Sequence, residues 1–241
     1  MSPTSCQTAP PRGNWFCRRP ARAQRRLRFY RIGGLRTNRR SHSRDAGGGC
    51  YTAPVQTPFA HFCSVCGHAI VRRVPAGDNR ERDCCDHCGA IHYVNPRPVV
   101  GTIPVWQERV LLCKRAIEPR YGYWTLPAGF MEVGETTAEG AIRETLEEAG
   151  ARIELGPLFS MIDVPHVEQV HIFFRARLLG PEFDVGHETL EARLFTEAEV
   201  PWHDLAFRTV STTLHLYFED RARGSFGTHT PRLPPLARPA A

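Results

Sequence analysis

Three glutamates stand close together in one acidic segment, at positions 144, 147 and 148. In an α-helix, residues three and four apart share a face, so Glu144, Glu147 and Glu148 would project within about 100° of one another. Carboxylates grouped in this way repel each other unless a cation lies between them. Oxygen ligands of this kind suit Mg²⁺, which also bridges to the phosphate groups of a substrate. The spacing therefore predicts a divalent-metal site that acts on phosphates.

The residues around the glutamates favour this metal site over the alternative, an acidic helix face that is merely solvated. Gly129, Glu135, Arg143 and Gly150 stand at fixed offsets around the cluster. An arginine within a group of carboxylates can orient them by bidentate hydrogen bonds. We therefore expect Arg143 to hold the acidic side chains in place.

The cysteines form a second cluster of chemically active residues. Cys63-Ser-Val-Cys66 and Cys85-Asp-His-Cys88 are two C-x-x-C pairs with 18 residues between them. Two such pairs supply four thiolates for a tetrahedral Zn²⁺ site, and this spacing lies in the zinc-ribbon range. The two-residue spacer favours Cys85 over its neighbour Cys84 as the ligand. Four thiolates leave no position open for a catalytic water, so we expect a structural zinc in a binding or dimerising element.

Helices and strands must position these side chains. Thr136 can cap a helix with Glu139 completing a capping box, and Gly150 stands where the helix should end, which predicts a helix over 137–149. Apolar runs predict five strands, and a last amphipathic pattern predicts a second helix. The strands are expected at 98–106, 109–115, 124–130, 153–162 and 170–179, and the second helix at 207–223.

The charge of the chain is divided unevenly. The 241 residues have a formal net charge of +6, but residues 1–60 hold 12 arginines and one acid, while the rest holds 19 basic and 24 acidic residues. A nucleic-acid groove over the whole protein is therefore disfavoured, and no apolar run is long enough to span a membrane. We expect four segments: a disordered Arg-rich extension at 1–60, a zinc ribbon at 61–92, a catalytic domain at 95–223 and a disordered tail at 224–241.

The segment from Gly129 to Gly150 resembles the Nudix box, which reads Gly, five residues, Glu, seven residues, Arg-Glu, an aliphatic residue, any residue, Glu-Glu, any residue, Gly and an aliphatic residue. Thr145 and Ala151 stand at the two aliphatic positions and are small departures from the pattern. The resemblance implies an α/β (α+β) fold, a Nudix α/β/α sandwich with a mixed sheet, behind a small zinc-ribbon domain. It also implies a hydrolase of phosphoanhydride bonds in nucleoside diphosphate-linked compounds.

The same resemblance implies a role for each acidic residue. Arg143 would brace the carboxylates, and a metal-activated water would split the diphosphate into two monophosphates. The catalytic base varies in this family, and the candidates are Glu148 in the box and Glu188 and Glu191 outside it. The catalytic Mg²⁺ or Mn²⁺ would be held by Glu135, Glu144, Glu147 and Glu148.

A zinc ribbon joined to a Nudix domain resembles two subgroups. The NADH pyrophosphatases carry a Ser-Gln-Pro-Trp-Pro-Phe-Pro run after the box, which this chain lacks. The plant chloroplast FAD pyrophosphatases and their bacterial relatives share segments such as Leu190-Glu-Ala-Arg-Leu-Phe195. We therefore expect a small-molecule dinucleotide such as FAD as substrate, with ADP-ribose or NADH as alternatives. Arg115, Trp124 and Gly129 are expected to bind it, although Trp124 also suits core packing and Arg115 a surface charge.

A function of another class stays open, namely an RNA-binding module that uses the ribbon and the arginine-rich arm beside a vestigial box. The intact set of box acids argues against it, and a zinc-ribbon adaptor would make no use of the three glutamates. We expect a cytoplasmic enzyme, able to form a homodimer, without a membrane or nucleic-acid partner. The alternative location is a plastid or mitochondrion, if residues 1–60 are a transit peptide.

Overall fold

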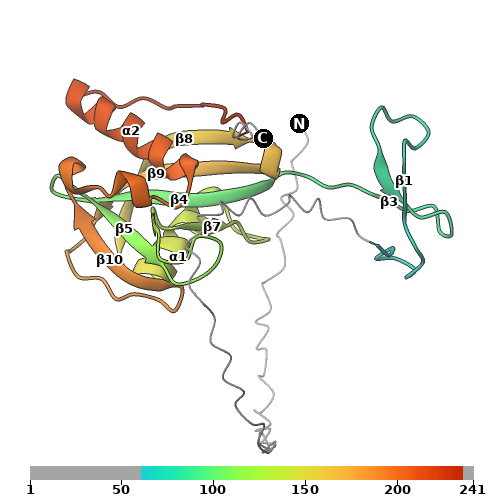
Figure 1. Cartoon of the computed structure of the whole chain (residues 1–241), viewed down its shortest axis with the longest axis horizontal. Helices are drawn as coiled ribbons and strands as arrows, with labels where there is room; N and C mark the ends of the chain where they lie inside the picture. Colours follow the sequence, from blue (N-terminus) through green and yellow to red (C-terminus); the bar gives the residue numbers. More distant parts are fainter. Residues whose placement is uncertain (1–60, 236–241) are drawn as a thin grey trace, which may run out of the picture. The chain divides into compact units, whose positions relative to one another are not determined.

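The computed structural model describes residues 61–235, which form two parts, a small cysteine-bearing sheet and a larger α/β domain (Figure 1). The expected disorder of residues 1–60 lies outside the described residues. The first part is a small antiparallel sheet in the order β1-β2-β3, and it carries the cysteine turns. Its strands are β1 (Val71–Arg73), β2 (Arg82–Cys84) and β3 (Ile91–His92).

The second part is built on a mixed sheet with the strand order β10-β5-β4-β9-β8, to which β6 adds beside β5 and β7 beside β4. Strands β4 and β9 run parallel, and all other pairs in this sheet are antiparallel. The strands are β4 (Arg97–Trp106), β5 (Arg109–Arg115), β6 (Trp124–Thr125), β7 (Ala128–Phe130), β8 (Ile153–Val164), β9 (Gln169–Leu178) and β10 (Thr189–Phe195).

Two helices cover the two faces of this sheet, α1 (Thr137–Ala149) and α2 (Arg208–Arg223) (Figure 1). Alternate residues of β5 show the division, because successive side chains of a strand point to opposite faces. Val110 and Leu112 pack in one core with residues of α2, whereas Leu111 and Cys113 pack in another with Ala149 of α1. The expected α/β/α sandwich with a mixed sheet is confirmed. Three short 3₁₀ helices complete the chain path: η1 (Pro165–Val167), η2 (Glu197–Glu199) and η3 (Trp202–Asp204).

Helix α1 has the bounds that the sequence predicts, because local signals fix both ends. The backbone N–H of Glu139 donates to the Thr136 hydroxyl, and the Glu139 carboxylate accepts from the Thr136 N–H at 2.8 Å. Gly150 ends the helix in the left-handed conformation with φ of 60°. Thr145, at an aliphatic position of the pattern, is buried and hydrogen-bonds to Thr102 of β4 at 2.7 Å, which ties the helix to the sheet. Among the described residues, no helix has the length and hydropathy needed to cross a membrane.

Apart from shifts of one or two residues at the ends of β4, β8, β9 and α2, the structure differs from the sequence-based expectation at three places. The run expected over 124–130 is split into β6 and β7, and strand β10 was not expected at all. The third difference is the tail, which was expected to be disordered from Gly224 onward. Residues 224–235 instead run along β8, where the N–H of Leu233 donates to Asp163 O at 2.9 Å. Prolines prevent a helix here, but they allow an extended segment that pairs with a distant strand.

Candidate active site and metal centres

Each C-x-x-C pair lies on a tight turn that is followed by a glycine. Gly67 and Gly89 both have a φ of 75°, a conformation that glycine adopts without strain. Their N–H groups donate to the carbonyl oxygens of Cys63 and Cys85 at 2.8 and 2.9 Å. The two turns therefore repeat the same geometry, and they gather the four sulfur atoms within 4.8 Å of one another.

This cluster fits a tetrahedral zinc ion. The Sγ atoms of Cys63 and Cys88 lie 3.6 Å apart, and those of Cys66 and Cys85 lie 3.5 Å apart. Four Zn–S bonds of about 2.3 Å at tetrahedral angles would place the sulfur atoms about 3.8 Å apart. The thiol of Cys84 lies instead 3.5 and 3.9 Å from two backbone carbonyl oxygens of β1 and β2, outside the cluster.

One residue of the ribbon was not singled out in the sequence. His92 on β3 has its Nε2 atom 3.3 Å from Cys63 Sγ, where it can orient the thiolate. It lies outside both C-x-x-C pairs, so their spacing gives no signal for it. His68 and His87 are exposed and stack on each other with ring centroids 3.5 Å apart, beside Cys66.

Arg143 holds the acidic cluster of the second part together. Its Nε and Nη2 atoms donate to the two carboxylate oxygens of Glu135 at 3.0 and 2.8 Å. Its Nη1 atom donates to Glu144 at 2.7 Å and to Glu147 at 3.0 Å. The hydrogen bonds from Arg143, together with one from the N–H of Glu132, lower the pKa of Glu135 to about 2. The expected bracing by Arg143 is therefore present as direct contacts to three carboxylates.

The three helical glutamates face different surroundings. Glu148 is 8% exposed and its Oε2 atom accepts the N–H of Ala128 at 3.0 Å. Burial raises the pKa of Glu148 to about 8, and burial also raises the pKa of Glu144. Both residues line a large cavity, whereas the Glu147 side chain is 59% exposed and does not line it.

A divalent cation matches the chemistry of this carboxylate pair. Desolvation disfavours the charged form of both side chains, and a nearby cation would favour it. Within residues 61–235, groups of three or more possible ligands whose ligand atoms all lie within 4.8 Å of one another occur only in the ribbon. The carboxylate oxygens of the three glutamates therefore do not all lie within 4.8 Å of one another. The donor set fits Mg²⁺ or Mn²⁺, because each of these ions keeps several waters and takes few protein oxygens.

Two glycines leave room for the carboxylates. A Cβ atom on Gly129 would lie 2.4 Å from the Glu144 carboxylate, and one on Gly140 would lie 2.6 Å from an oxygen of Glu135. The side chains of Glu144 and Glu135 therefore occupy the space that a side chain at position 129 or 140 would need. Gly129 was expected to bind substrate, and it does line the cavity, but its position against Glu144 is the stronger constraint.

A third acid reaches the cavity from the loop before β10. The N–H of Gly186 donates to Glu148 O at 3.2 Å, and a Cβ on Gly186 would lie 1.9 Å from Glu147 O. This close approach packs the loop against the end of α1 and places Glu188 in the cavity wall. The charge of Glu188 contributes to the raised pKa of both Glu144 and Glu148.

The remaining expected site residues divide between the cavity and its surroundings. Arg115 lines the cavity of about 870 Å³, and its charge acts on Glu148. Glu191 is exposed on β10, paired in register with Lys114, and does not line the cavity. Trp124 is 8% exposed and packs in the core with its ring edge against Phe195, which is the packing alternative weighed for it above.

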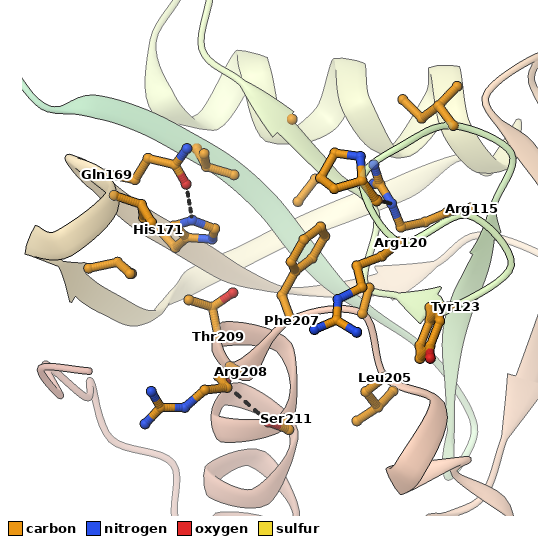
Figure 2. A pocket seen from close by; sticks show the side chains of 18 of the residues that line it. Arg115, Arg120, Tyr123, Gln169, His171, Leu205, Phe207, Arg208, Thr209 and Ser211 are labelled. Atoms are coloured by element: carbon orange, nitrogen blue, oxygen red, sulfur yellow. Dashed lines mark hydrogen bonds between the residues drawn. The ribbon is translucent and has the colours of Figure 1, made fainter. Parts of the chain in front are cut away.

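Part of the cavity is lined by four uncharged residues, three polar and one aromatic, that the sequence gave no reason to choose. Gln169 and His171 come from β9, and Phe207 and Thr209 come from the start of α2. We call these four residues the uncharged wall. In the view of Figure 2, Gln169, His171 and Thr209 lie on one side of the cavity, Arg115 on the other, and the ring of Phe207 between them. They belong to no motif, because a strand and a helix distant in the sequence bring them together.

Comparison with known proteins gives matches over both described parts. The family model described as NUDIX domain matches residues 95–214, and the model described as Nudix N-terminal, a zinc ribbon, matches residues 61–94. Among solved structures, the crystal structure of a NUDIX hydrolase from Nitrosomonas europaea is 50% identical with a TM-score of 0.70. That match covers 71% of this chain and 98% of the other.

Two curated proteins are similar over shorter regions. The ADP-ribose pyrophosphatase of Methanocaldococcus jannaschii is 32% identical over 115 residues, which are 45% of this chain and 67% of that protein. The NAD-capped RNA hydrolase NudC of Pectobacterium carotovorum is 31% identical over 133 residues, which are 55% of this chain. The match spans 48% of that relative, about half its length.

Proposed function

This chain belongs to the Nudix family and is a Nudix pyrophosphohydrolase, and from this we propose that it splits the diphosphate of a dinucleotide such as FAD. The proposal rests on one observation: the acids Glu144, Glu148 and Glu188 and the base Arg115 all line a single cavity of about 870 Å³. That volume is enough for a nucleotide-sized ligand, since ligand pockets measure about 300–1,000 Å³. ADP-ribose is the alternative substrate, as in the archaeal relative.

Each side chain has a distinct role in this proposal. Glu144 and Glu148 would hold Mg²⁺ or Mn²⁺ from within the cavity and Glu147 from its exposed rim. The ion supplies positive charge against the diphosphate oxygens. Arg143 keeps the carboxylates oriented, and Glu135 acts through its bidentate contact with Arg143. Arg115 contributes a further positive charge for a phosphate group.

We propose Glu188 as the group that takes the proton from the attacking water. The water oxygen bonds to one phosphorus, the bridging P–O bond breaks, and the second phosphate leaves, which gives two monophosphates. Glu188 lines the cavity beside Glu144 and Glu148, whereas Glu191 is exposed on β10 and does not line it. Glu148 stays the second candidate for the base.

The substrate is tested with a panel of FAD, ADP-ribose, NADH, coenzyme A, diadenosine polyphosphates and NAD-capped RNA, each with Mg²⁺ or Mn²⁺. We expect monophosphate products, with the highest kcat/KM on FAD. A higher value on ADP-ribose would replace FAD with the alternative, and activity on the capped RNA alone would give the chain the substrate named for the NudC relative. Salt-dependent retention on RNA without hydrolysis of any diphosphate would instead support the RNA-binding module.

The catalytic base is tested by a matched pair of variants. Glu188→Gln should lower kcat by about 10²–10⁴-fold, as expected for loss of a general base. Glu191→Gln removes the same charge only three residues away, outside the cavity, and should retain normal activity. The reverse result would assign the base to Glu191, and normal activity in both variants would leave Glu148 as the base.

The compartment and assembly are proposals as well. Free thiols at the four zinc-binding positions fit a reducing compartment such as the cytoplasm. A homodimer is tested by light scattering of the full chain, with and without a zinc chelator. Loss of a dimer on zinc removal would place the contact on the ribbon, as proposed for this element.

A further inference from the structure

Two buried side-chain nitrogen or oxygen atoms in the described part of the chain have no hydrogen-bond partner, and both belong to residues that line the catalytic cavity. They are Thr209 Oγ1 and His166 Nδ1. Thr209 is 4% exposed, so its hydroxyl group is also withheld from bulk water. An unpartnered buried hydroxyl costs about 1–3 kcal/mol, and native proteins keep few of them. Because Thr209 lines the cavity, rotation of its side chain toward the cavity would let a ligand supply the missing partner.

The neighbouring pair on β9 presents further unused hydrogen-bonding groups. His171 Nε2 lies 2.9 Å from the Oε1 atom of Gln169. Because a carbonyl oxygen only accepts, Nε2 carries the proton and Nδ1 is left as an acceptor. Burial lowers the pKa of His171 to about 4, so the ring is neutral at physiological pH. The Gln169 amide nitrogen has no partner among the described residues, which leaves a donor beside the acceptor.

The aromatic member of the uncharged wall completes a surface for a flat ring. Phe207 lines the cavity, and the Arg115 guanidinium lies over its ring at 5.1 Å. Two more arginines line the cavity. Arg120 lies over the Tyr123 ring at 5.3 Å. Arg208 donates to Pro234 O at 2.7 Å and is directed away from Phe207 in Figure 2. The four members of the wall therefore offer an aromatic face, a donor and acceptors and carry no charge themselves, while the cation in contact with the wall is Arg115.

We propose that the uncharged wall is a recognition site for the neutral heterocyclic ring of one nucleoside half of the substrate. This rests on the proposed function, which places the diphosphate at the glutamates. Phe207 stacks on the ring, Gln169 and His171 bind a neighbouring acceptor and donor on its edge, and the Thr209 hydroxyl makes one more hydrogen bond. Adenine and the flavin ring both combine such an edge with a flat aromatic face, whereas a sugar phosphate has no aromatic face to stack on Phe207.

The test compares ligands with and without the ring. Titration calorimetry with Mg²⁺ measures the Kd values of AMP, FMN and ribose 5-phosphate, which cause no turnover. We expect AMP or FMN to bind at least tenfold more tightly than ribose 5-phosphate, and the tighter of the two identifies the ring. Equal affinity for all three ligands would overturn the proposal.

Variants assign the selectivity to the wall. Thr209→Val keeps the side-chain shape and removes the hydroxyl, and we expect a 5- to 20-fold loss of affinity for the preferred ring ligand with no change for ribose 5-phosphate. His171→Leu removes the acceptor and should act in the same direction. Thr212→Val is the matched control, since Thr212 lies on the same helix and does not line the cavity.

Two further measurements are needed. One distinguishes ring binding by the wall from a merely structural role, and the other distinguishes failure of the ring site from failure of the proposed function. On the diphosphate substrate, Thr209→Val should raise KM and leave kcat near the wild-type value. Unchanged ring affinity in both Thr209→Val and His171→Leu would overturn the ring site even if hydrolysis is normal. Selective ring binding without hydrolysis of FAD or ADP-ribose would support the ring site and count against the proposed dinucleotide substrate alone.

Discussion

The buried carboxyl group of Glu148 should make the metal-free protein sensitive to pH. Glu148→Gln keeps the size of the side chain and an oxygen that can accept the Ala128 N–H, but it removes the charge. In the metal-free protein, burial raises the pKa of Glu148 from its ordinary value of 4.5 to about 8. The folded state therefore favours the protonated form.

The sign and size of this effect of pH on stability follow from the linkage between folding and proton binding. A carboxyl group whose pKa is raised in the folded state lowers stability as pH rises from 4.5 toward 8, because the unfolded chain gives up its proton first. The rise of the Glu148 pKa from 4.5 to about 8 corresponds to about 5 kcal/mol as an upper bound, since a tenfold change in proton affinity is about 1.4 kcal/mol. For a chain of this size, each kcal/mol shifts Tm by about 2–4 °C. A difference in Tm on the order of 10 °C is expected.

The assay is thermal unfolding of wild type and Glu148→Gln between pH 4.5 and 8.5. The divalent metal is removed with a chelator that leaves the ribbon zinc in place. The wild type should lose stability relative to the variant as pH rises, and added Mg²⁺ at pH 8 should restore it in the wild type alone. Glu219→Gln, at an exposed position on α2, is the control for a change of one carboxyl group.

Parallel pH profiles for wild type and Glu148→Gln would refute this reasoning. They would mean that burial of Glu148 is relieved by solvent or by movement of the helix, and that the carboxylate needs no cation. A Mg²⁺ effect of equal size in both proteins would refute the assignment of Glu148 as a metal ligand, whatever the pH profiles show.

Three shorter predictions concern the other elements of the site. Gly129→Ala would place a methyl group against the Glu144 carboxylate. Because this carboxylate can rotate out of its position, we expect kcat to fall by about tenfold or more with little change in Tm. Gly227→Ala is the control, because a Cβ atom there would meet no other atom within 4 Å. Cys85→Ser should reduce zinc content and thermal stability, whereas Cys84→Ser should keep the zinc, and metal analysis after dialysis distinguishes them. Removal of residues 1–60 should leave kcat on a small diphosphate substrate within about tenfold of the value for the full chain. A larger loss of kcat in a truncated protein that folds and binds zinc would show that residues 1–60 reach the active site.

The sequence by itself determined the elements whose signals are local. The capping box and Gly150 act within a few residues, so helix α1 has its predicted bounds, and strand β5 also has the bounds expected from its apolar run. The two C-x-x-C turns repeat one geometry because each is followed by a glycine. Spacing alone grouped Glu144, Glu147 and Glu148 on one face of a single helix, and the Nudix box was identified by its resemblance to the family pattern.

Only the tertiary structure decided which of these side chains meet in the cavity. Spacing on a helix gives Glu144, Glu147 and Glu148 one face, but packing against the sheet buries Glu148 and leaves Glu147 exposed. Glu188 rather than Glu191 lines the cavity because the Gly186 loop packs on the end of α1.

The uncharged wall and the extended segment at residues 224–235 both depend on contacts between segments that are far apart in the sequence. Strand β9, the start of α2 and residues 224–235 meet through pairing and packing between segments far apart in the chain. Such contacts depend on the whole fold, and no local pattern of residue types encodes them. The chemistry of this protein could thus be predicted from one helix and two cysteine pairs, whereas the shape that selects a substrate comes from long-range packing.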